Sequence, residues 1–173
     1  MFLRLEAATN RSTESKMKIT YDDRNSFALA GTVRWSPASK ELLWTWEPRL
    51  PTGYVVYLML VEEDVKKGGI AKDTAASNFK TRMQSEFSVA RQVIIGPIPG
   101  RPLPRWRQRP PDPFKKNAPP YLEQGLAIEL WAKSCATPEL MHSEETRLNL
   151  KYRGEWTKEG WTRDGRRLLP TDF

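Results

Sequence analysis

The alternation of apolar and polar positions along the chain predicts several β-strands. Phe27–Trp35 and Glu41–Pro48 flank the turn sequence SPASK, which predicts a β-hairpin. The continuous apolar run Tyr54–Val61 has the length of a buried strand. The polar residues EED follow it, so Val65–Ala71 is predicted to return antiparallel. Residues 90–97, ARQVIIGP, are predicted to form the third strand of a central sheet.

Three further segments carry the spacing of helices. Asp73 or Thr74 can cap the first helix, whose apolar residues recur at every fourth position. These residues are Ala75, Phe79, Met83 and Phe87. A second helix is predicted over Tyr121–Lys133, and a third begins at Pro138 with Thr137 as its N-cap. The predicted fold class is therefore α+β, with a small three-stranded antiparallel sheet flanked by helices and an N-terminal β-hairpin.

Composition divides the chain into regions. Nine of its 14 prolines fall within residues 97–120. Because proline has no N–H and a fixed φ, this stretch is predicted to be a long loop, inserted for a functional reason. Residues 1–18 are polar without a sustained period and are predicted to form a flexible arm. Residues 19–173 are predicted to be one domain, with a core at 52–134 and a C-terminal helix and basic tail at 135–173.

The net charge of the chain indicates what kind of partner it binds. The chain has 28 Lys and Arg against 21 Asp and Glu, a net charge of +7. Such an excess attracts polyanions, and double-stranded DNA is the predicted partner. A solvated basic loop that merely aids solubility is the alternative. The predicted DNA-binding residues are Lys72, Lys80, Arg101, Arg105, Trp106, Arg107, Arg109, Lys115 and Lys116. Trp106 would stack on a base or anchor the loop to the domain.

Several classes of site are excluded by composition. The single cysteine, Cys135, excludes an internal disulfide framework and fits a reducing compartment. The single histidine, His142, excludes histidine-based triads, HExxH helices and zinc fingers. No signal peptide is recognisable, and the longest apolar run is too short to span a bilayer. A cytoplasmic protein that does not enter membranes is therefore expected.

The side chains that remain suit metal-assisted phosphate chemistry. Hydrolysis of a phosphodiester needs a hard cation, which carboxylate oxygens bind. It needs a donor such as arginine for the phosphoryl oxygens, and a group that accepts a proton from water. The chain supplies carboxylates, arginines, lysines and tyrosines for these tasks.

Four short motifs carry these residue types in a fixed order. They are TGYVVY on the predicted strand, KKGGIAKD on its partner, FKTRMQ on the first helix and YLEQGLAIELWAK on the second. This order resembles the GIY-YIG nuclease family, in the variant with lysine in the second motif that some small type II restriction endonucleases use. The resemblance covers residues 52–134.

The resemblance implies a role for each matching residue. Tyr54 would hold or deprotonate the attacking water. Lys67 would stand where many members have tyrosine, and would act as the base if burial lowers its pKa. Arg82 would grip the scissile phosphate. Glu123 or Glu129 would bind Mg²⁺, or another divalent cation such as Mn²⁺.

The chain also departs from the family pattern. Gly68 stands where the second motif usually has isoleucine. Glu86 or Phe87 occupies the place of a tyrosine or histidine that usually follows the arginine. An asparagine expected after the glutamate helix corresponds at best to Asn149, at a longer separation.

The leading hypothesis is thus a metal-dependent DNA endonuclease of restriction type, for which a homodimer is the expected assembly. A phage or repair nuclease would use the same residues. A non-catalytic nucleic-acid-binding protein and a proline-rich protein-interaction module are the alternatives from other classes. A nuclease of the PD-(D/E)xK kind, based on Asp64, Val65 and Lys66, is the rival within the enzyme class.

Overall fold

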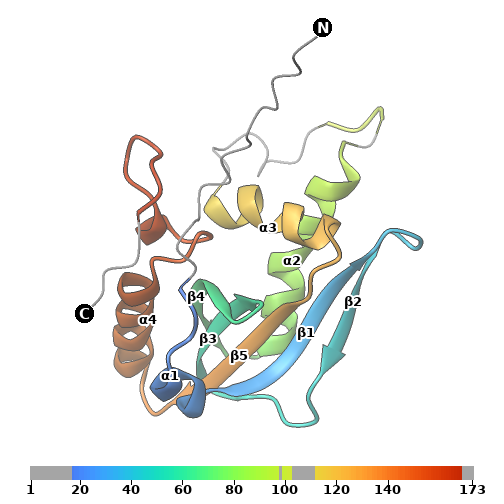
Figure 1. Cartoon of the computed structure of the whole chain (residues 1–173). Coiled ribbons are helices and arrows are strands. Elements are labelled where there is room, and N and C mark those ends of the chain that lie inside the picture. Colours follow the sequence, from blue (N-terminus) through green and yellow to red (C-terminus); the bar gives the residue numbers. More distant parts are fainter. Residues whose placement is uncertain (1–16, 98, 103–111, 169–173) are drawn as a thin grey trace, which may run out of the picture.

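A five-stranded antiparallel sheet forms the centre of the computed structural model, which describes residues 17–97, 99–102 and 112–168 (Figure 1). In spatial order, the strands are β2 (Glu41–Trp46), β1 (Ala28–Ser36), β5 (Ile128–Cys135), β3 (Tyr54–Val61) and β4 (Asp64–Lys72). The predicted mixture of helices and antiparallel strands is confirmed, and so are both hairpins. The prediction of three strands is wrong, because β1 and β2 join the same sheet through β5.

Helices cover both faces of this sheet (Figure 1). On one face lie α2 (Phe79–Ile95) and α3 (Pro113–Glu123). On the other lies α4 (Pro138–Tyr152), with the short α1 (Tyr21–Ser26) beside it. None of the helices in the described part of the chain has the length and apolar character that crossing a bilayer requires.

The alternation of β3 separates two hydrophobic cores. Odd-numbered residues of the strand, including Tyr57 and Met59, pack with α2 and α3. Even-numbered residues, including Leu58 and Leu60, pack with α4. Successive side chains of a strand point to opposite faces, and both faces here are buried, which is why this strand is a continuous apolar run. Two residues of β3 can therefore take part in one site only if both are odd-numbered or both are even-numbered, so that their side chains lie on the same face.

Two predicted elements are wrong in type. Residues 90–97 are not a third strand but the end of α2, whose apolar stripe continues to Ala90. The predicted helix Tyr121–Lys133 is divided by Gly125, which has a φ of 78° and ends the helical geometry. After Gly125 the burial of Ile128, Leu130 and Ala132 follows a period of two, as in a strand.

The proline-rich stretch is only partly a loop. Its last eight residues begin α3, which starts at Pro113 after Asp112 as N-cap. The Asp112 side chain accepts a hydrogen bond from the Lys115 amide at 2.9 Å. Proline suits the first helical turn, and the burial of Phe114, Ala118 and Leu122 holds the rest against the sheet despite internal prolines. Residues 103–111 lie outside the described residues, as does most of the predicted arm, at 1–16.

The C-terminal basic tail is folded, and residues 153–168 are called here the C-terminal strap. The Trp156 amide donates to the Lys66 carbonyl of β4 at 2.9 Å. Gly154 lies so close to the same carbonyl that a Cβ would collide with it. The Arg167 guanidinium donates to three backbone carbonyls, among them that of Gly160 at 2.7 Å. These contacts hold the strap against the edge of the sheet formed by β4.

A buried acidic network anchors α4 to α1. Asp23, 4% exposed, accepts hydrogen bonds from the side chains of Arg147, Lys151 and Tyr152. Burial alone would raise the pKa of Asp23, but these three donors lower it well below its usual value. The network fixes the position of α4, whose other side reaches the site described next.

Candidate active site

Tyr57 and Lys67 face the same side of the sheet. Lys67 pairs with Met59 across the β3–β4 ladder, and Met59 shares its face with Tyr57. The Lys67 amine lies 4.8 Å from the ring centre of Phe114, at the start of α3. A phenol and an amine from the two strands of one hairpin therefore meet under the first turn of α3.

A carboxylate from α2 joins these two groups. The Tyr57 hydroxyl donates to Glu86 Oε2 at 2.9 Å, and the Lys67 amine forms an ion pair with Glu86 Oε1. The side chains of Glu86 and Lys67 are only 11% and 18% exposed. Glu86 of α2 thus bonds to one side chain of β3 and one of β4.

Arg82 lies one helical turn before Glu86, on the same side of α2. Its positive charge acts on both Tyr57 and Lys67, lowering the pKa of each. Unlike its two neighbours, Arg82 is exposed to solvent. An exposed guanidinium beside a buried phenol and amine suits the binding of an anion that arrives from outside.

A cavity of about 290 Å³ opens beside Lys67 at the free edge of β4. Lys67 and Gly68 line one side of it, and Glu145 and Asn149 of α4 line another. The Gly68 amide donates to Asn149 Oδ1 at 3.1 Å, so this helix residue binds the outer edge of the strand. Trp156 to Glu159 of the C-terminal strap line the cavity as well. The cavity brings together residues that are up to 92 positions apart in sequence, counting from Lys67 to Glu159.

Two adjacent glycines make this arrangement possible. A Cβ on Gly68 would lie 2.7 Å from Asn149 Oδ1, where no real Cβ fits. A Cβ on Gly69 would collide with the ring and hydroxyl of Tyr57. Gly68 therefore stands in place of the expected isoleucine because α4 approaches β4 directly at this point.

Burial sets the protonation of the three titratable groups. It raises the pKa of the Tyr57 phenol above its usual range, an effect that Arg82 opposes and Glu145 reinforces. It lowers the pKa of the Lys67 amine to about 8. It also raises the pKa of Glu145, which the positive charge of Lys67 partly offsets. Near neutral pH the phenol keeps its proton, whereas the amine can gain or lose one.

The structure brings only some of the predicted catalytic residues together. Lys67 and Arg82 are neighbours in the site. Tyr54 differs from Tyr57 in parity, so it faces away from Lys67, and it lies at the far end of the strand opposite Lys72. The tyrosine of the first motif that meets Lys67 is Tyr57.

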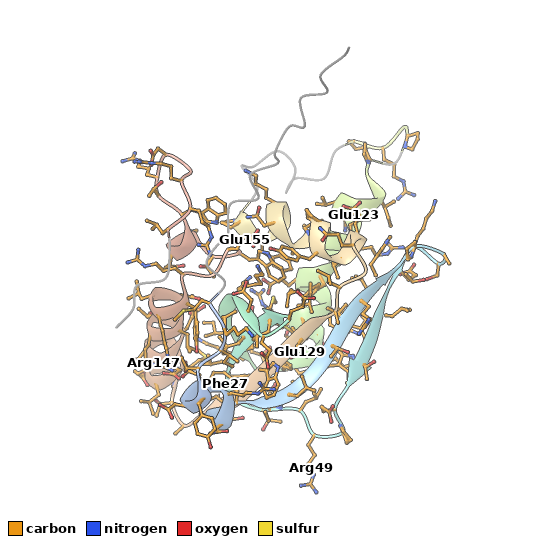
Figure 2. All side chains as sticks on the ribbon, viewed as in Figure 1. Phe27, Arg49, Glu123, Glu129, Arg147 and Glu155 are labelled. Carbon is orange, nitrogen blue, oxygen red and sulfur yellow. The ribbon has the colours of Figure 1, made fainter. Side chains whose placement is uncertain are left out.

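The two predicted metal-binding glutamates lie apart from each other (Figure 2), and neither lines the cavity beside Lys67. Glu123 ends α3, nine residues after Phe114, which corresponds to about 14 Å along the helix. Glu129 is on β5 opposite Leu60, and therefore faces α4 rather than α2 and α3. Its carboxylate accepts a hydrogen bond from the Trp131 indole at 2.8 Å.

Glu145 was not among the residues predicted from the sequence, although its carboxylate lines the cavity beside Lys67. It stands four residues before Asn149 in SEETRLN, so both side chains lie on one flank of α4. An acid followed at i+4 by an asparagine was the available signal. The expected asparagine at Asn149 does line the cavity.

The protein ligands for a divalent cation are few. Within the described ranges, no group of three or more His, Cys, Asp or Glu side chains could enclose a metal ion. The carboxylates that line the open cavity are those of Asp112, Glu145 and Glu159, of which Glu145 and Glu159 are half-buried. Mg²⁺ fits such a donor set, because it keeps several waters and is commonly bound by one or two carboxylates together with phosphate oxygens.

Two solved structures of other proteins resemble this one. The chain shares the fold of bacteriophage T4 EndoII. A mutant of that protein superposes with a TM-score of 0.50 at 15% identity, over 78% of this chain and 94% of the other. The restriction endonuclease HPY188I, solved in complex with product DNA, matches with a TM-score of 0.43 at 14% identity. That match covers 70% of this chain and 64% of the other, so the chain spans less than two thirds of HPY188I. No family model and no curated protein matches the sequence.

Of the nine predicted DNA-binding residues, five lie in the described part of the chain and four lie outside it. Lys80, Arg101 and Lys116 are exposed, and so is Lys72 at the end of β4. Lys115 is at the start of α3, 3.3 Å from Asp112, and its charge acts on Lys67. The remaining four residues lie outside the described residues, namely Arg105, Trp106, Arg107 and Arg109.

The residues of the rival PD-(D/E)xK motif form a closed network. Lys66 contacts Asp64 at 2.8 Å, Glu155 at 3.0 Å and the Tyr121 hydroxyl at 2.8 Å. The side chains of Lys66 and Asp64 are 7% and 10% exposed. Because each charge is already paired, this cluster joins β4, α3 and the strap, and removing one partner would leave the others unpaired in a largely buried place.

Proposed function

We propose that this protein is a metal-dependent DNA endonuclease, a variant of the GIY-YIG type, that hydrolyses phosphodiesters at the cavity beside Lys67. The observation that carries the proposal is the convergence of Tyr57, Lys67, Arg82 and Glu145 from four different elements. The fold shared with bacteriophage T4 EndoII agrees with it. The basic excess of the chain suits a polyanionic substrate.

Each residue has a distinct task in this proposal. Arg82 donates hydrogen bonds to the non-bridging oxygens of the scissile phosphate, where negative charge grows during attack. Tyr57 orients the attacking water. Lys67, in its neutral form, accepts the proton that this water loses as its oxygen bonds to phosphorus. The phosphorus–oxygen bond on the opposite side then breaks, and the leaving oxygen takes a proton from solvent.

Glu145 would hold the cation of this site, with Mg²⁺ as the ion that fits best. When bound, the ion supplies positive charge that neutralises the phosphoryl oxygens. The carboxylate itself is half-buried and lies near Lys67. Burial raises the pKa of Glu145, and a cation bound there would lower it again, as the positive charge of Lys67 does in part.

Restriction-type cleavage of both DNA strands requires two such sites, which a homodimer would provide. The exposed side chains of Lys80 and Lys116 lie at the starts of α2 and α3, the helices that flank Lys67, and would bind neighbouring phosphates. The cytoplasm, where the DNA substrate is found, is the proposed location.

The experiment is a plasmid assay with a matched arginine control. The wild type is expected to cut supercoiled plasmid in Mg²⁺ but not in excess chelator. Arg82→Ala should lower the initial rate by roughly 10²-fold or more, the usual effect of removing one transition-state donor. Arg91→Ala, on the same helix but paired with Glu41, should retain a rate close to that of the wild type.

Two outcomes would contradict the proposal. One is a plasmid that stays intact over a broad set of DNA sequences with Mg²⁺ or Mn²⁺. If DNA is nevertheless retarded in a salt-dependent manner, the protein is a non-catalytic DNA-binding protein. The other is equal loss of activity in Arg82→Ala and Arg91→Ala, which would assign the effect to α2 as a whole.

A further inference from the structure

Glu86 uses both oxygens of one carboxylate within the site. Oε2 accepts the Tyr57 hydroxyl hydrogen, and Oε1 is ion-paired with the Lys67 amine. No resemblance assigns this residue a task, since a tyrosine or histidine was expected near its position. A buried carboxylate between two candidate reacting groups therefore needs its own explanation.

We propose that Glu86 is the positioning residue of the site, which holds the Tyr57 phenol and the Lys67 amine in one arrangement. The inference rests on the proposed nuclease function. A carboxylate is an acceptor only, so the single hydrogen of the Tyr57 hydroxyl must point toward Glu86. The lone pairs of the phenol oxygen remain free to accept a hydrogen bond from the attacking water. Glu86 thus makes Tyr57 an acceptor toward the substrate side.

The same carboxylate controls the charge of Lys67. Titratable or charged groups of five other segments also surround this amine or its cavity: Tyr57, Arg82, Asp112, Lys115, Glu145, Lys158 and Glu159. Glu86 differs from them because it contacts the amine directly. A negative group in contact favours the protonated amine and opposes the effect of burial. Glu86 therefore sets how much of Lys67 is neutral at a given pH.

A simpler role must be separated from this one. Glu86 also ties α2 to the β3–β4 hairpin, so its removal could weaken packing without any effect on the charge of Lys67. A purely structural contact would change the amount of folded protein or the plateau rate. It would not move the pH at which activity appears.

The test compares the pH–rate profiles of Glu86→Gln, Glu86→Asp and the wild type. Glutamine keeps the size but loses the charge, and its amide nitrogen is a donor that cannot accept from either partner. The rise of kcat/KM with pH should have its midpoint at least about one pH unit lower in Glu86→Gln. The plateau should fall by roughly tenfold or more, because one amide oxygen cannot accept from Tyr57 and Lys67 in the way that the two carboxylate oxygens do. Glu86→Asp should keep a midpoint close to that of the wild type.

Glu41→Gln is the matched control. Glu41 also pairs with α2, through Arg91 at 2.7 Å, but lies at the exposed start of β2. Its removal should leave both midpoint and plateau unchanged. An unmoved midpoint in folded Glu86→Gln, or an equal shift in Glu86→Asp, would overturn the proposal.

A second readout needs no activity at all. The 13Cε signal of Lys67, assigned by its loss in Lys67→Met, reports the protonation of the amine directly. Its titration midpoint should fall by about one pH unit or more in Glu86→Gln. If the wild type cuts no DNA but this shift is observed, the proposed function fails while the link between Glu86 and Lys67 stands. If the midpoint does not move, the positioning role is wrong whether or not DNA is cut.

Discussion

Glu145→Gln is expected to lower the rate of plasmid cleavage by roughly 10²-fold or more, because a neutral amide is a poor replacement for the one cavity carboxylate on α4. Glu123→Gln and Glu129→Gln should cut DNA at rates close to that of the wild type. The three changes are chemically identical, so they differ only in where the structure places the side chain. Initial rates in Mg²⁺ over a range of metal concentrations are the measurement.

The metal dependence adds a second criterion to this comparison. A weakened cation site should raise the Mg²⁺ concentration needed for half-maximal activity in Glu145→Gln. Circular dichroism and thermal unfolding of each variant exclude a loss of folded protein. Inactivity of Glu123→Gln or Glu129→Gln, together with full activity of Glu145→Gln, would contradict this assignment. The metal ligand would then be the glutamate that the family resemblance predicts.

Tyr57→Phe is the second change with a large expected effect, again roughly 10²-fold in the cleavage rate. It removes only the hydroxyl that bonds to Glu86 at 2.9 Å and leaves the aromatic ring in the core. Tyr54→Phe removes a hydroxyl three residues earlier on the same strand, from a side chain that is 37% exposed. Because it faces away from Lys67, its loss should change the rate little.

The two tyrosine variants show whether the face of β3 or the position in the family motif decides which tyrosine takes part in the reaction. If Tyr54→Phe is the inactive variant, the residue order of the family motif outweighs the geometry of β3, and the site must be rebuilt on the other face. If both variants are active, neither phenol takes part in the reaction.

The sequence predicted most local elements of the fold correctly. Both hairpins, the start of α4 at Pro138 and the core-facing positions Phe79, Met83 and Phe87 of α2 follow from short-range rules of periodicity and capping. The predicted cap at Asp73 or Thr74 is wrong, because α2 begins at Phe79 with Asn78 as its N-cap, so Ala75 lies outside the helix. The errors arose where two rules competed. Leu122, Leu126 and Leu130 have helical spacing, but the left-handed conformation at Gly125 ends α3 and allows β5 to form.

The site was harder to predict than the fold for a physical reason. Lys67 and Arg82 lie within one short stretch of chain, and the sequence predicts both as candidates for the site that the structure places them beside. Glu145 comes from α4, which packs on the sheet through the second core, is bonded to α1 through Asp23, and approaches β4 where Gly68 leaves room for Asn149. No local pattern contains that information.

The choice between Tyr54 and Tyr57 shows the same limit on a smaller scale. Both occur in TGYVVY, and both fit the first motif. The face of each side chain follows from the pairing of β3 with β4, in which Tyr57 lies opposite Gly69 and Met59 opposite Lys67. Register is a tertiary property when both faces of a strand are apolar, because the hydrophobic pattern then carries no parity.

The most direct test of the shared pocket is the cleavage rate of Lys67→Met, measured beside Lys72→Met on the same strand. Methionine fills the apolar space of the lysine stem while removing the amine. Because Lys67 touches Glu86 and lines the cavity with Glu145, its loss should reduce supercoiled-plasmid cleavage in Mg²⁺ by roughly 10²-fold or more. Lys72 is exposed at the strand end, so its loss would remove at most one contact to the DNA backbone and should change the rate far less than the loss of Lys67. A folded Lys67→Met variant that cuts plasmid as fast as the wild type would contradict the account.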